Sequence, residues 1–263
     1  MDDDNYVEIP RAMRSRHIYR IVSVERLFEL FENRQNVLTK PKKWDDPFEN
    51  FILRARMRLQ TGQLAQFSFH DQFYGQCWTL QTASDAMWRI YSPDRNAVRI
   101  RSTILTVAES LTAALGEYAQ IQAFIGKVRY LPSKRLRAFA GGWFPGTHGL
   151  RARVSAETLL VKRPAFKHER EVRLLYFQHN AVDTVGDLYW YNVNPHAFID
   201  QIMIDPRMPE SDVNALKRRI QEKTGFRGPV LRSLIYAAPP TLIVQGSDAP
   251  NNPSQRTLAS ERR

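Results

Sequence analysis

Two glutamates and an arginine alternate over five residues in the second half of the chain. Glu169, Glu171 and Arg173 stand two positions apart, and Val172 and Leu174 fall between and after them. A period of two is typical of a β-strand, which would place the charged side chains on one face and the apolar ones on the other. Ion pairing with the arginine would keep the carboxyl groups ionised, whereas a dry pocket would raise their pKa. The pattern predicts either a functional carboxylate or a structural salt-bridge ladder on a strand edge.

The segment before these glutamates is basic and contains a proline. Between residues 126 and 175, twelve lysines and arginines face three glutamates, a net charge of +9 out of +11 for the 263-residue chain. A positive field of this kind attracts phosphate groups, so we expect an anionic ligand: a nucleic acid, a nucleotide cofactor or an acidic partner. The candidate phosphate-binding residues are Lys127, Arg129, Lys162, Arg163 and Lys167.

The remaining composition narrows the class of protein. The single cysteine, Cys77, allows neither an internal disulfide nor a cysteine-based zinc site. The acidic N-terminus contains no apolar signal, and no stretch approaches the roughly 18 apolar residues that a membrane span requires. We therefore expect a soluble, cytoplasmic protein. Phosphate-loop, dinucleotide-fingerprint, zinc-helix and serine-hydrolase motifs are absent from the sequence, and its six histidines are scattered.

Short apolar segments with strand character alternate irregularly with helices. Apolar periodicity and capping residues predict helices over 24–33, 103–117 and 210–223, the first with Ser23 as its N-cap. Residues 131–148, which are rich in glycine, predict an irregular stretch. This arrangement favours a single α+β domain with a mixed, mainly antiparallel sheet and peripheral helices. We expect a flexible N-terminal arm over 1–15, the domain over 16–243 and a disordered polar tail over 244–263.

Two further elements carry side chains that could bind a ligand. A predicted strand over 18–22 carries Tyr19 and Arg20, and a short helix after Ser84 carries Trp88 and Tyr91 three positions apart on one face. The aromatic pair is also typical of a helix face packed on the core. Arg20 has a structural alternative as well, because it could bridge Glu49 or Glu171.

Four segments in this order resemble one family. They are residues 18–20 with 44–49, 77–79 with 87–91, 127–130, and 162 with 166–173. The chain from about 17 to 235 resembles the bacterial domain of unknown function 2971, although Asp45 replaces the usual asparagine of that family. The family layout is similar to ADP-ribosyltransferase folds, which place an arginine or histidine on the first strand, an aromatic or hydroxyl residue in the middle and a glutamate before a late strand.

This resemblance implies site residues and a cofactor. The implied catalytic residues are Glu171, as the main carboxylate, and Glu169, as its modulator or salt-bridge partner, and NAD would be the co-substrate. The implied cofactor-binding residues are Tyr19, Arg20, Ser84, Trp88, Tyr91 and Arg173. Nicotinamide–ribose cleavage develops positive charge on the ribose, which a nearby carboxylate stabilises, while an arginine holds phosphate.

Three functions remain open on the sequence. The first is an ADP-ribosyltransferase-like enzyme that modifies a macromolecule, such as a toxin or a phage-defence effector, with no metal. The second is a nucleic-acid-binding protein that uses the basic region over 126–175. The third is a nuclease in which Glu169, Glu171 and Asp45 or Asp46 hold magnesium.

Overall fold

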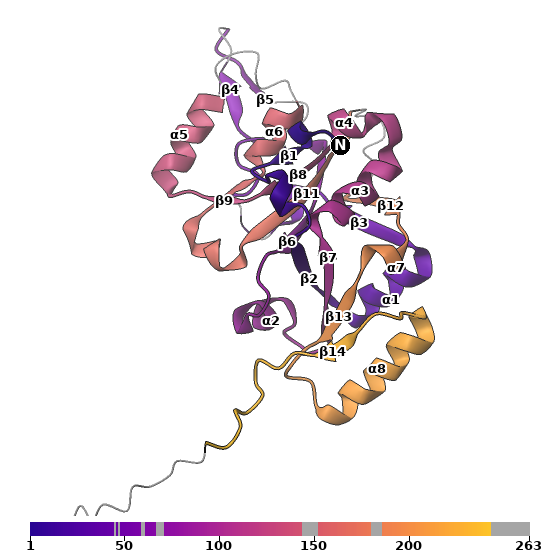
Figure 1. Cartoon of the computed structure of the whole chain (residues 1–263). Helices are drawn as coiled ribbons and strands as arrows, with labels where there is room; N and C mark the ends of the chain where they lie inside the picture. The colour runs from indigo at the N-terminus through magenta and orange to yellow at the C-terminus, as the bar shows by residue number, and fades with distance from the viewer. Residues whose placement is uncertain are drawn as a thin grey trace, which may run out of the picture.

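A ten-stranded mixed sheet runs through the protein (Figure 1). The computed structural model describes residues 1–44, 46, 48–58, 61–66, 71–143, 152–179 and 186–242. Along the sheet the strands are β1 (Tyr6–Val7), β8 (Ala123–Lys127), β11 (Glu171–Phe177), β6 (Phe73–Thr79), β2 (His17–Ser23), β7 (Ala97–Thr103), β13 (Gln201–Ile204) and β14 (Val230–Arg232). Only β1–β8 and β13–β14 are parallel pairs in this sheet. The predicted mixed, mainly antiparallel sheet in a single α/β unit is confirmed.

The edge of β6 that faces away from β11 is divided between two strands. Thr79, at one end of β6, pairs with Tyr19 of β2. Gly75, near the other end, pairs with Thr39 of β3 (Gln35–Thr39). Beyond these single contacts β2 follows β7, and β3 follows β12 (Leu188–Asn192). The sheet therefore forks between β2 and β3, which α1 (Val24–Asn33) connects.

A buried glutamine closes the base of this fork. Gln76 of β6 donates from Nε2 to the carbonyl oxygen of Val37 at 2.8 Å and to Oδ1 of Asn36 at 2.7 Å. Its Oε1 accepts from Nε1 of Trp78 at 2.8 Å. The side chain thus supplies β3 with a hydrogen-bond partner where main-chain pairing to β6 is missing.

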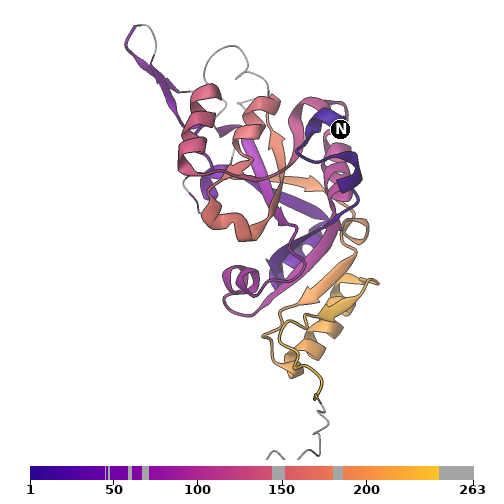
Figure 2. The same cartoon turned by 60° about the vertical axis from the view of Figure 1, so that its left-hand side comes forward.

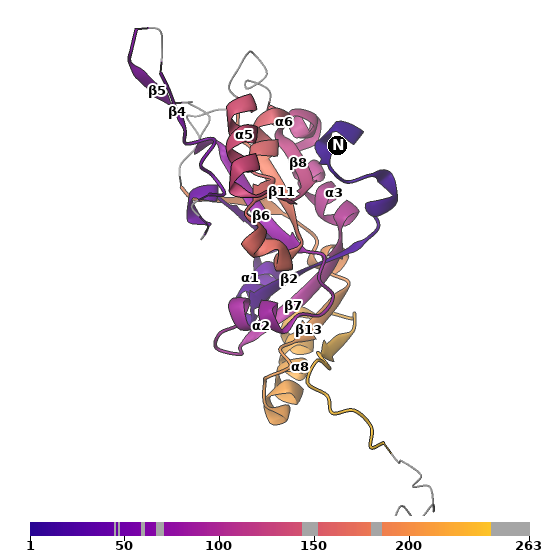
Figure 3. The same ribbon diagram turned by 90° about the vertical axis from the view of Figure 1, so that its left-hand side faces the viewer.

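Two cores lie on opposite faces of the sheet. Leu174 of β11 belongs to a core that includes α1, α3 (Ile104–Leu115) and α8 (Glu210–Thr224). The next residue, Leu175, belongs to a second core that includes α5 (Ser133–Trp143) and α6 (Ala152–Thr158). Figure 3 shows α5 and α6 at the β8–β11 end of the molecule and α8 beside β13 at the other end. The strand period of two places these neighbours in different cores.

The remaining helices are short. They are α2 (Asp85–Tyr91), α4 (Ala119–Gln122) and α7 (Pro195–Phe198). A small hairpin of β4 (Arg56–Arg58) and β5 (Leu64–Gln66) projects from the end of the molecule that carries α5 (Figure 2). No helix in the described ranges is long and apolar enough to cross a membrane.

Local sequence signals located several helices correctly. The helix over 24–33 is confirmed at both ends, and Ser23 accepts from the amide of Arg26 at 3.2 Å. The helices expected over 103–117 and 210–223 correspond to α3 and α8. The expectation of an irregular stretch over 131–148 is wrong for its first part, which forms α5 because Leu136 and Phe139 of that helix pack into the second core.

Part of the N-terminal segment is held against the sheet. Tyr6 and Val7 of β1 pair with Ile125 and Gly126, and both are buried. The side chain of Asn5 donates to the carbonyl of Ala123 at 2.7 Å. The segment over 1–15, for which we expected a flexible arm, therefore has fixed contacts through residues 5–7. The predicted tail over 244–263 lies outside the described residues, and the domain boundaries stay predictions.

Candidate active site at the fork of the sheet

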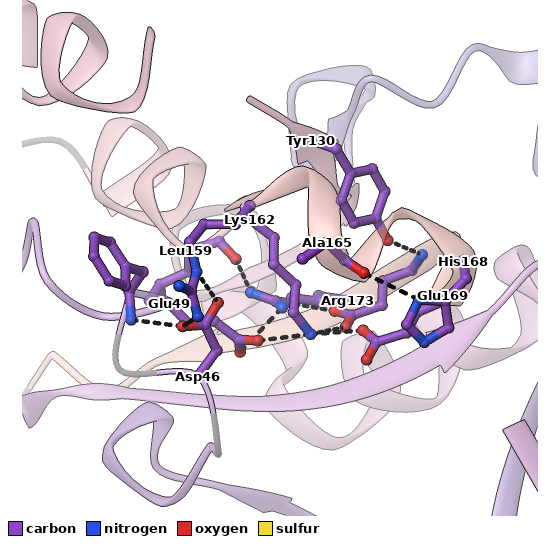
Figure 4. Close-up of polar contacts among 12 residues, drawn as sticks. Asp46, Glu49, Tyr130, Leu159, Lys162, Ala165, His168, Glu169 and Arg173 are labelled. Atoms are coloured by element: carbon purple, nitrogen blue, oxygen red, sulfur yellow. Dashed lines mark hydrogen bonds and ion pairs between the residues drawn. The ribbon is translucent and has the colours of Figure 1, made fainter. Parts of the chain in front are cut away.

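Three carboxylates surround one buried lysine at the end of β11 (Figure 4). Nζ of Lys162 lies 2.7 Å from Oε1 of Glu49, 2.6 Å from Oε2 of Glu169 and 2.7 Å from Oε1 of Glu171. Arg173 is fully buried behind them. Its Nε lies 2.6 Å from Oε2 of Glu171, and its Nη2 lies 3.1 Å from Oε2 of Glu49. The two cations thus fix three side chains that come from separate parts of the chain.

Three elements bring these groups together. Glu171 is the first residue of β11, opposite Thr79, and Arg173 follows on the same face, opposite Cys77. Lys162 ends β10 (Val161–Lys162), which pairs in parallel with β9 (Arg129–Tyr130). Glu169 ends a 3-10 helix (Pro164–Glu169) and not the strand, because Arg170 takes a left-handed conformation with φ of 45°. The period of two therefore begins at Glu171, two residues later than the sequence suggested.

The two neighbouring glutamates have opposite pKa shifts. Burial raises the pKa of Glu169, and its hydrogen bond with Glu171 raises it further. Burial alone would raise the pKa of Glu171 as well, but the charge of Arg173 and the hydrogen bond with Glu169 outweigh it and lower that pKa. Three carboxyl groups share only two cations, so the carboxyl group farther from Arg173 retains a proton to higher pH.

A cavity of about 360 Å³ opens over this cluster. Its walls come from β2, β6, α2, the turn around Glu49 and the 3-10 helix before β11. The predicted site residues that line it are Tyr19, Arg20, Tyr91, Lys162, Glu169 and Glu171. Tyr91 is 44% exposed, and its hydroxyl lies 3.4 Å from Oε1 of Glu169. The cavity thus contains a carboxylate pair, an accessible aromatic ring and an arginine.

Arg20 carries a charge that no described carboxylate neutralises. Its side chain is partly buried in the fork, and among the described residues it has neither a hydrogen bond nor an ion pair. Burial lowers the pKa of its guanidinium group. The structural alternative for this residue, a bridge to Glu49 or Glu171, is therefore not formed. A desolvated cation without a partner is unfavourable, and an anionic ligand would offset that cost.

Several expected ligand-binding residues point elsewhere. Trp88 is 1% exposed and belongs to the interior, whereas Tyr91 on the same short helix faces the cavity. Ser84 caps α2 by accepting from the amide of Met87 at 3.3 Å. Arg173 lies behind Glu171 and does not line the cavity. Because an α-helix has 3.6 residues per turn, side chains three positions apart point in slightly different directions. This difference places Trp88 in the core and Tyr91 at the cavity.

The expected phosphate-binding residues differ in whether their charges are exposed or already engaged by other side chains. Lys127 and Lys167 are exposed, and Arg129 stacks over the ring of Phe139. Arg163 pairs with Asp46 at 2.8 Å. Lys162 is buried among carboxylates, so its ammonium group does not face solvent as the basic sequence run suggested.

The expected magnesium ligands do not converge. Asp45 lies outside the described residues, and Asp46 is engaged by Arg163. The ammonium group of Lys162 occupies the centre of the carboxylate cluster. In the described part of the chain, no group of three or more histidine, cysteine, aspartate or glutamate residues is arranged to hold a metal ion.

Sequence reasoning missed several residues that contact the carboxylate cluster and fix its side chains. Glu49 joins the cluster from a turn in which its amide donates to the carbonyl oxygen of Asp46. The ring of Trp44 stacks on Arg173, with 4.4 Å from the guanidinium carbon to the ring centroid. That ring also packs on Gly75, where a Cβ atom would lie 2.6 Å from it. Thr79 donates to the carbonyl oxygen of Glu169 and holds the end of the 3-10 helix. None of these contacts has a local sequence signal, except that Gly75 leaves space for a neighbour.

No protein-family model and no curated protein matches the chain. Among solved structures, it is similar to DarT of Thermus sp. 2.9 in complex with NAD+, with 12% identity, coverage of 86% of this chain and 97% of that chain, and a TM-score of 0.39. The complex of the same protein with carba-NAD+ gives 13% identity, 85% and 96% coverage and a TM-score of 0.37. Its complex with ADP-ribosylated ssDNA gives 11% identity, 86% and 95% coverage and a TM-score of 0.38. Membership of the domain of unknown function 2971 family stays a prediction.

Proposed function

We propose that the protein is an ADP-ribosyltransferase-like enzyme that cleaves the nicotinamide–ribose bond of NAD and transfers ADP-ribose to a macromolecule. One observation carries the proposal: the unpaired Arg20 and the Glu169–Glu171 pair line the same cavity. NAD offers the matching chemistry, because it joins an anionic pyrophosphate to a ribose that becomes positively charged when nicotinamide leaves. An arginine suits the first group and an ionised carboxylate suits the second.

The proposed reaction moves one bond and one proton. The bond between ribose C1′ and the nicotinamide nitrogen breaks, and its electron pair leaves with nicotinamide. A nucleophilic oxygen or nitrogen of the acceptor forms the new bond to C1′ and loses its proton to a carboxylate. The negative charge of Glu171 stabilises the oxocarbenium-like transition state. Its lowered pKa keeps it ionised across the neutral range.

Proton transfer is assigned to Glu169. Glu171 has both oxygens engaged by cations, Oε1 by Lys162 and Oε2 by Arg173. Glu169 directs one oxygen to Lys162 and the other towards the hydroxyl of Tyr91. Its raised pKa makes it the stronger base of the two carboxylates. The proposal thus gives Glu169 a specific catalytic role, proton transfer, where the sequence suggested a modulator or salt-bridge partner of Glu171.

Two side chains would orient NAD. Arg20 would hold the pyrophosphate, and the exposed ring of Tyr91 offers a stacking surface for nicotinamide. Three of the predicted residues would not touch the ligand but would hold its contacts in place. Trp88 packs in the core, Ser84 caps α2, and Arg173 pairs with Glu171.

The acceptor that fits the charge distribution best is a nucleic acid. The β4–β5 hairpin and the segment before it carry Arg54, Arg56 and Arg58, all exposed, and α5 carries exposed Lys134, Arg135 and Arg137. Neither segment 50–70 nor segment 126–143 contains an aspartate or glutamate. The hairpin and α5 belong to the same end of the molecule (Figure 2). Clusters of this kind attract a phosphate backbone.

The test combines turnover with product analysis. The purified protein is incubated with NAD and, separately, with single-stranded DNA, RNA and a protein mixture, and released nicotinamide is measured. Mass spectrometry then searches each acceptor for an added ADP-ribose group. Wild type is expected to release nicotinamide and to modify a nucleic acid. Absence of nicotinamide release with every acceptor, from protein shown to be folded, would overturn the proposal. Modification of protein alone would overturn the choice of acceptor.

A further inference from the structure

A second cavity, of about 420 Å³, lies in the fork between β2 and β3. It adjoins the first, because Arg20, Ile21 and Thr39 line both. Its other walls are the first turns of α1 and the ribbon formed by β3 and β12. Arg20 therefore lies between the two cavities. Glu169 and Glu171 line the first cavity and do not line the second.

The second cavity is mainly apolar and has an aromatic rim. Val37 pairs with Trp190 and Thr39 with Leu188, and all four line the cavity. Trp190 is 40% exposed and Leu188 is 45% exposed, and Trp190 has no aromatic partner among the described residues. A large accessible indole ring beside an apolar wall is suited to stacking on a flat ring such as a nucleobase.

The edge of β2 in this cavity has free hydrogen-bonding capacity. Arg20 to Ser23 pair with β7 on one side, and on the other side of β2 Tyr19 alone has a strand partner among the residues that the structure describes. The exposed part of a strand edge presents main-chain donors and acceptors. The amino group and ring nitrogens at the edge of adenine, and the hydroxyls of a ribose, can use both kinds of group.

The two cavities, with Arg20 lining both, fit an elongated ligand that has a ring at each end and an anionic centre. We propose that the cavity between β2 and β3 is a subsite for the AMP half of a dinucleotide, with the base stacked on Trp190 and the pyrophosphate on Arg20. The nicotinamide riboside end then lies in the first cavity, beside Glu169 and Glu171. This inference rests on the proposed function, because NAD is the dinucleotide whose other half would react.

The subsite is tested with the two halves of the ligand. Dissociation constants of AMP, ADP-ribose and nicotinamide mononucleotide are measured by calorimetry, and KM and kcat for NAD are measured by nicotinamide release. The variants are Trp190→Ala, which removes the stacking ring, and Val37→Phe, which fills the cavity. Tyr118→Ala is the matched control, because Tyr118 is an exposed aromatic residue in the 3-10 helix after α3 and lines neither cavity. Thermal unfolding shows that each variant is folded.

Loss of the indole is expected to weaken AMP and ADP-ribose binding on the order of tenfold and to act on KM for NAD more than on kcat. Nicotinamide mononucleotide binding should change far less, and the control should change nothing. Equal weakening of both halves, or unchanged AMP and ADP-ribose binding in both variants, would overturn the subsite.

The binding measurements need no turnover, so the two proposals fail separately. A protein that binds AMP in a Trp190-dependent way but never cleaves NAD retains the subsite and loses the proposed reaction. A protein that cleaves NAD with the same KM in wild type and in both variants keeps the reaction and loses the subsite.

Discussion

Two groups of charged side chains meet at the fork, and they differ in how their charges are neutralised. Lys162 and Arg173 lie among three carboxylates: Lys162 pairs with all three, and Arg173 pairs with two of them. Arg20, on β2, has no such partner among the described residues. Ion pairs between buried groups hold side chains in place, and breaking one leaves an uncompensated charge. The first group is therefore suited to positioning the carboxylates, and Arg20 is suited to meeting a charge that arrives with a ligand.

The largest effect is expected from replacing the ionised carboxylate. Glu171→Gln keeps the shape of the side chain but removes the charge that stabilises the transition state, so nicotinamide release should fall on the order of a hundredfold to a thousandfold. Glu157→Gln is the control, since Glu157 pairs with Arg153 on α6 away from the cavity. Similar rates for Glu171→Gln and wild type would remove Glu171 from the mechanism.

Removing Lys162, the cation at the centre of the carboxylate cluster, should mainly reduce stability. Lys162→Met leaves three buried carboxyl groups with Arg173 alone, so the free energy of unfolding should fall by about 3–5 kcal/mol. The exposed Lys127→Met is the control and should change it by less than about 0.5 kcal/mol. Denaturant titration monitored by fluorescence measures both. Equal, small changes in the two variants would mean that the cluster does not fix the carboxylates.

Removing the unpaired arginine should separate binding from stability. Arg20→Met is expected to weaken ADP-ribose binding roughly tenfold or more, because a charge-assisted contact with phosphate is lost. The free energy of unfolding should stay the same or rise, because a partly buried cation without a partner no longer has to be desolvated. Arg173→Met should instead lower the free energy of unfolding, because Glu49 and Glu171 lose a buried ion-pair partner. Calorimetry and denaturant titration on the two variants sharpen the comparison directly.

The smallest effect concerns pH. The folded-state pKa of Glu169 is raised above its unfolded value, so its protonated form favours the fold at low pH, and this contribution is lost as pH rises through the raised pKa. Glu169→Gln should therefore lose less stability than wild type as pH rises from the unfolded value of 4.5 to the raised pKa of about 8. ADP-ribose transfer to an acceptor should increase with pH over the same window in wild type and lose this dependence in the variant. Parallel pH profiles for both proteins would contradict a proton-transfer role for Glu169.

Local sequence signals predicted the elements and the members of the site better than their arrangement. Ser23 and the spacing of Leu27 and Phe31 are enough to define α1, because a cap and a helical stripe are properties of neighbouring residues. The alternation after Glu171 defined β11 for the same reason. The fork was not predictable, since it depends on β6 pairing with two strands through single residues far apart in the chain.

The roles of individual cations also depended on long-range contacts. Lys162 and Arg163 are adjacent in a basic run, yet one is buried among carboxylates and the other pairs with Asp46. Sequence position cannot distinguish them, because Glu49, which pairs with Lys162, and Asp46, which pairs with Arg163, lie far away in the chain. Trp190, which forms the rim of the second cavity, had no signal beyond its strand, and only the register of β12 on β3 brings it beside Val37.

The central claim is that Arg20 and the two glutamates act on one ligand. The most direct measurement is a crystal structure of the Glu171→Gln variant soaked with NAD. We predict density for a pyrophosphate within hydrogen-bond distance of the Arg20 guanidinium group, with ribose C1′ next to Gln at position 171 and to Glu169. Density for NAD elsewhere on the protein, with Arg20 still unpaired, would contradict the account.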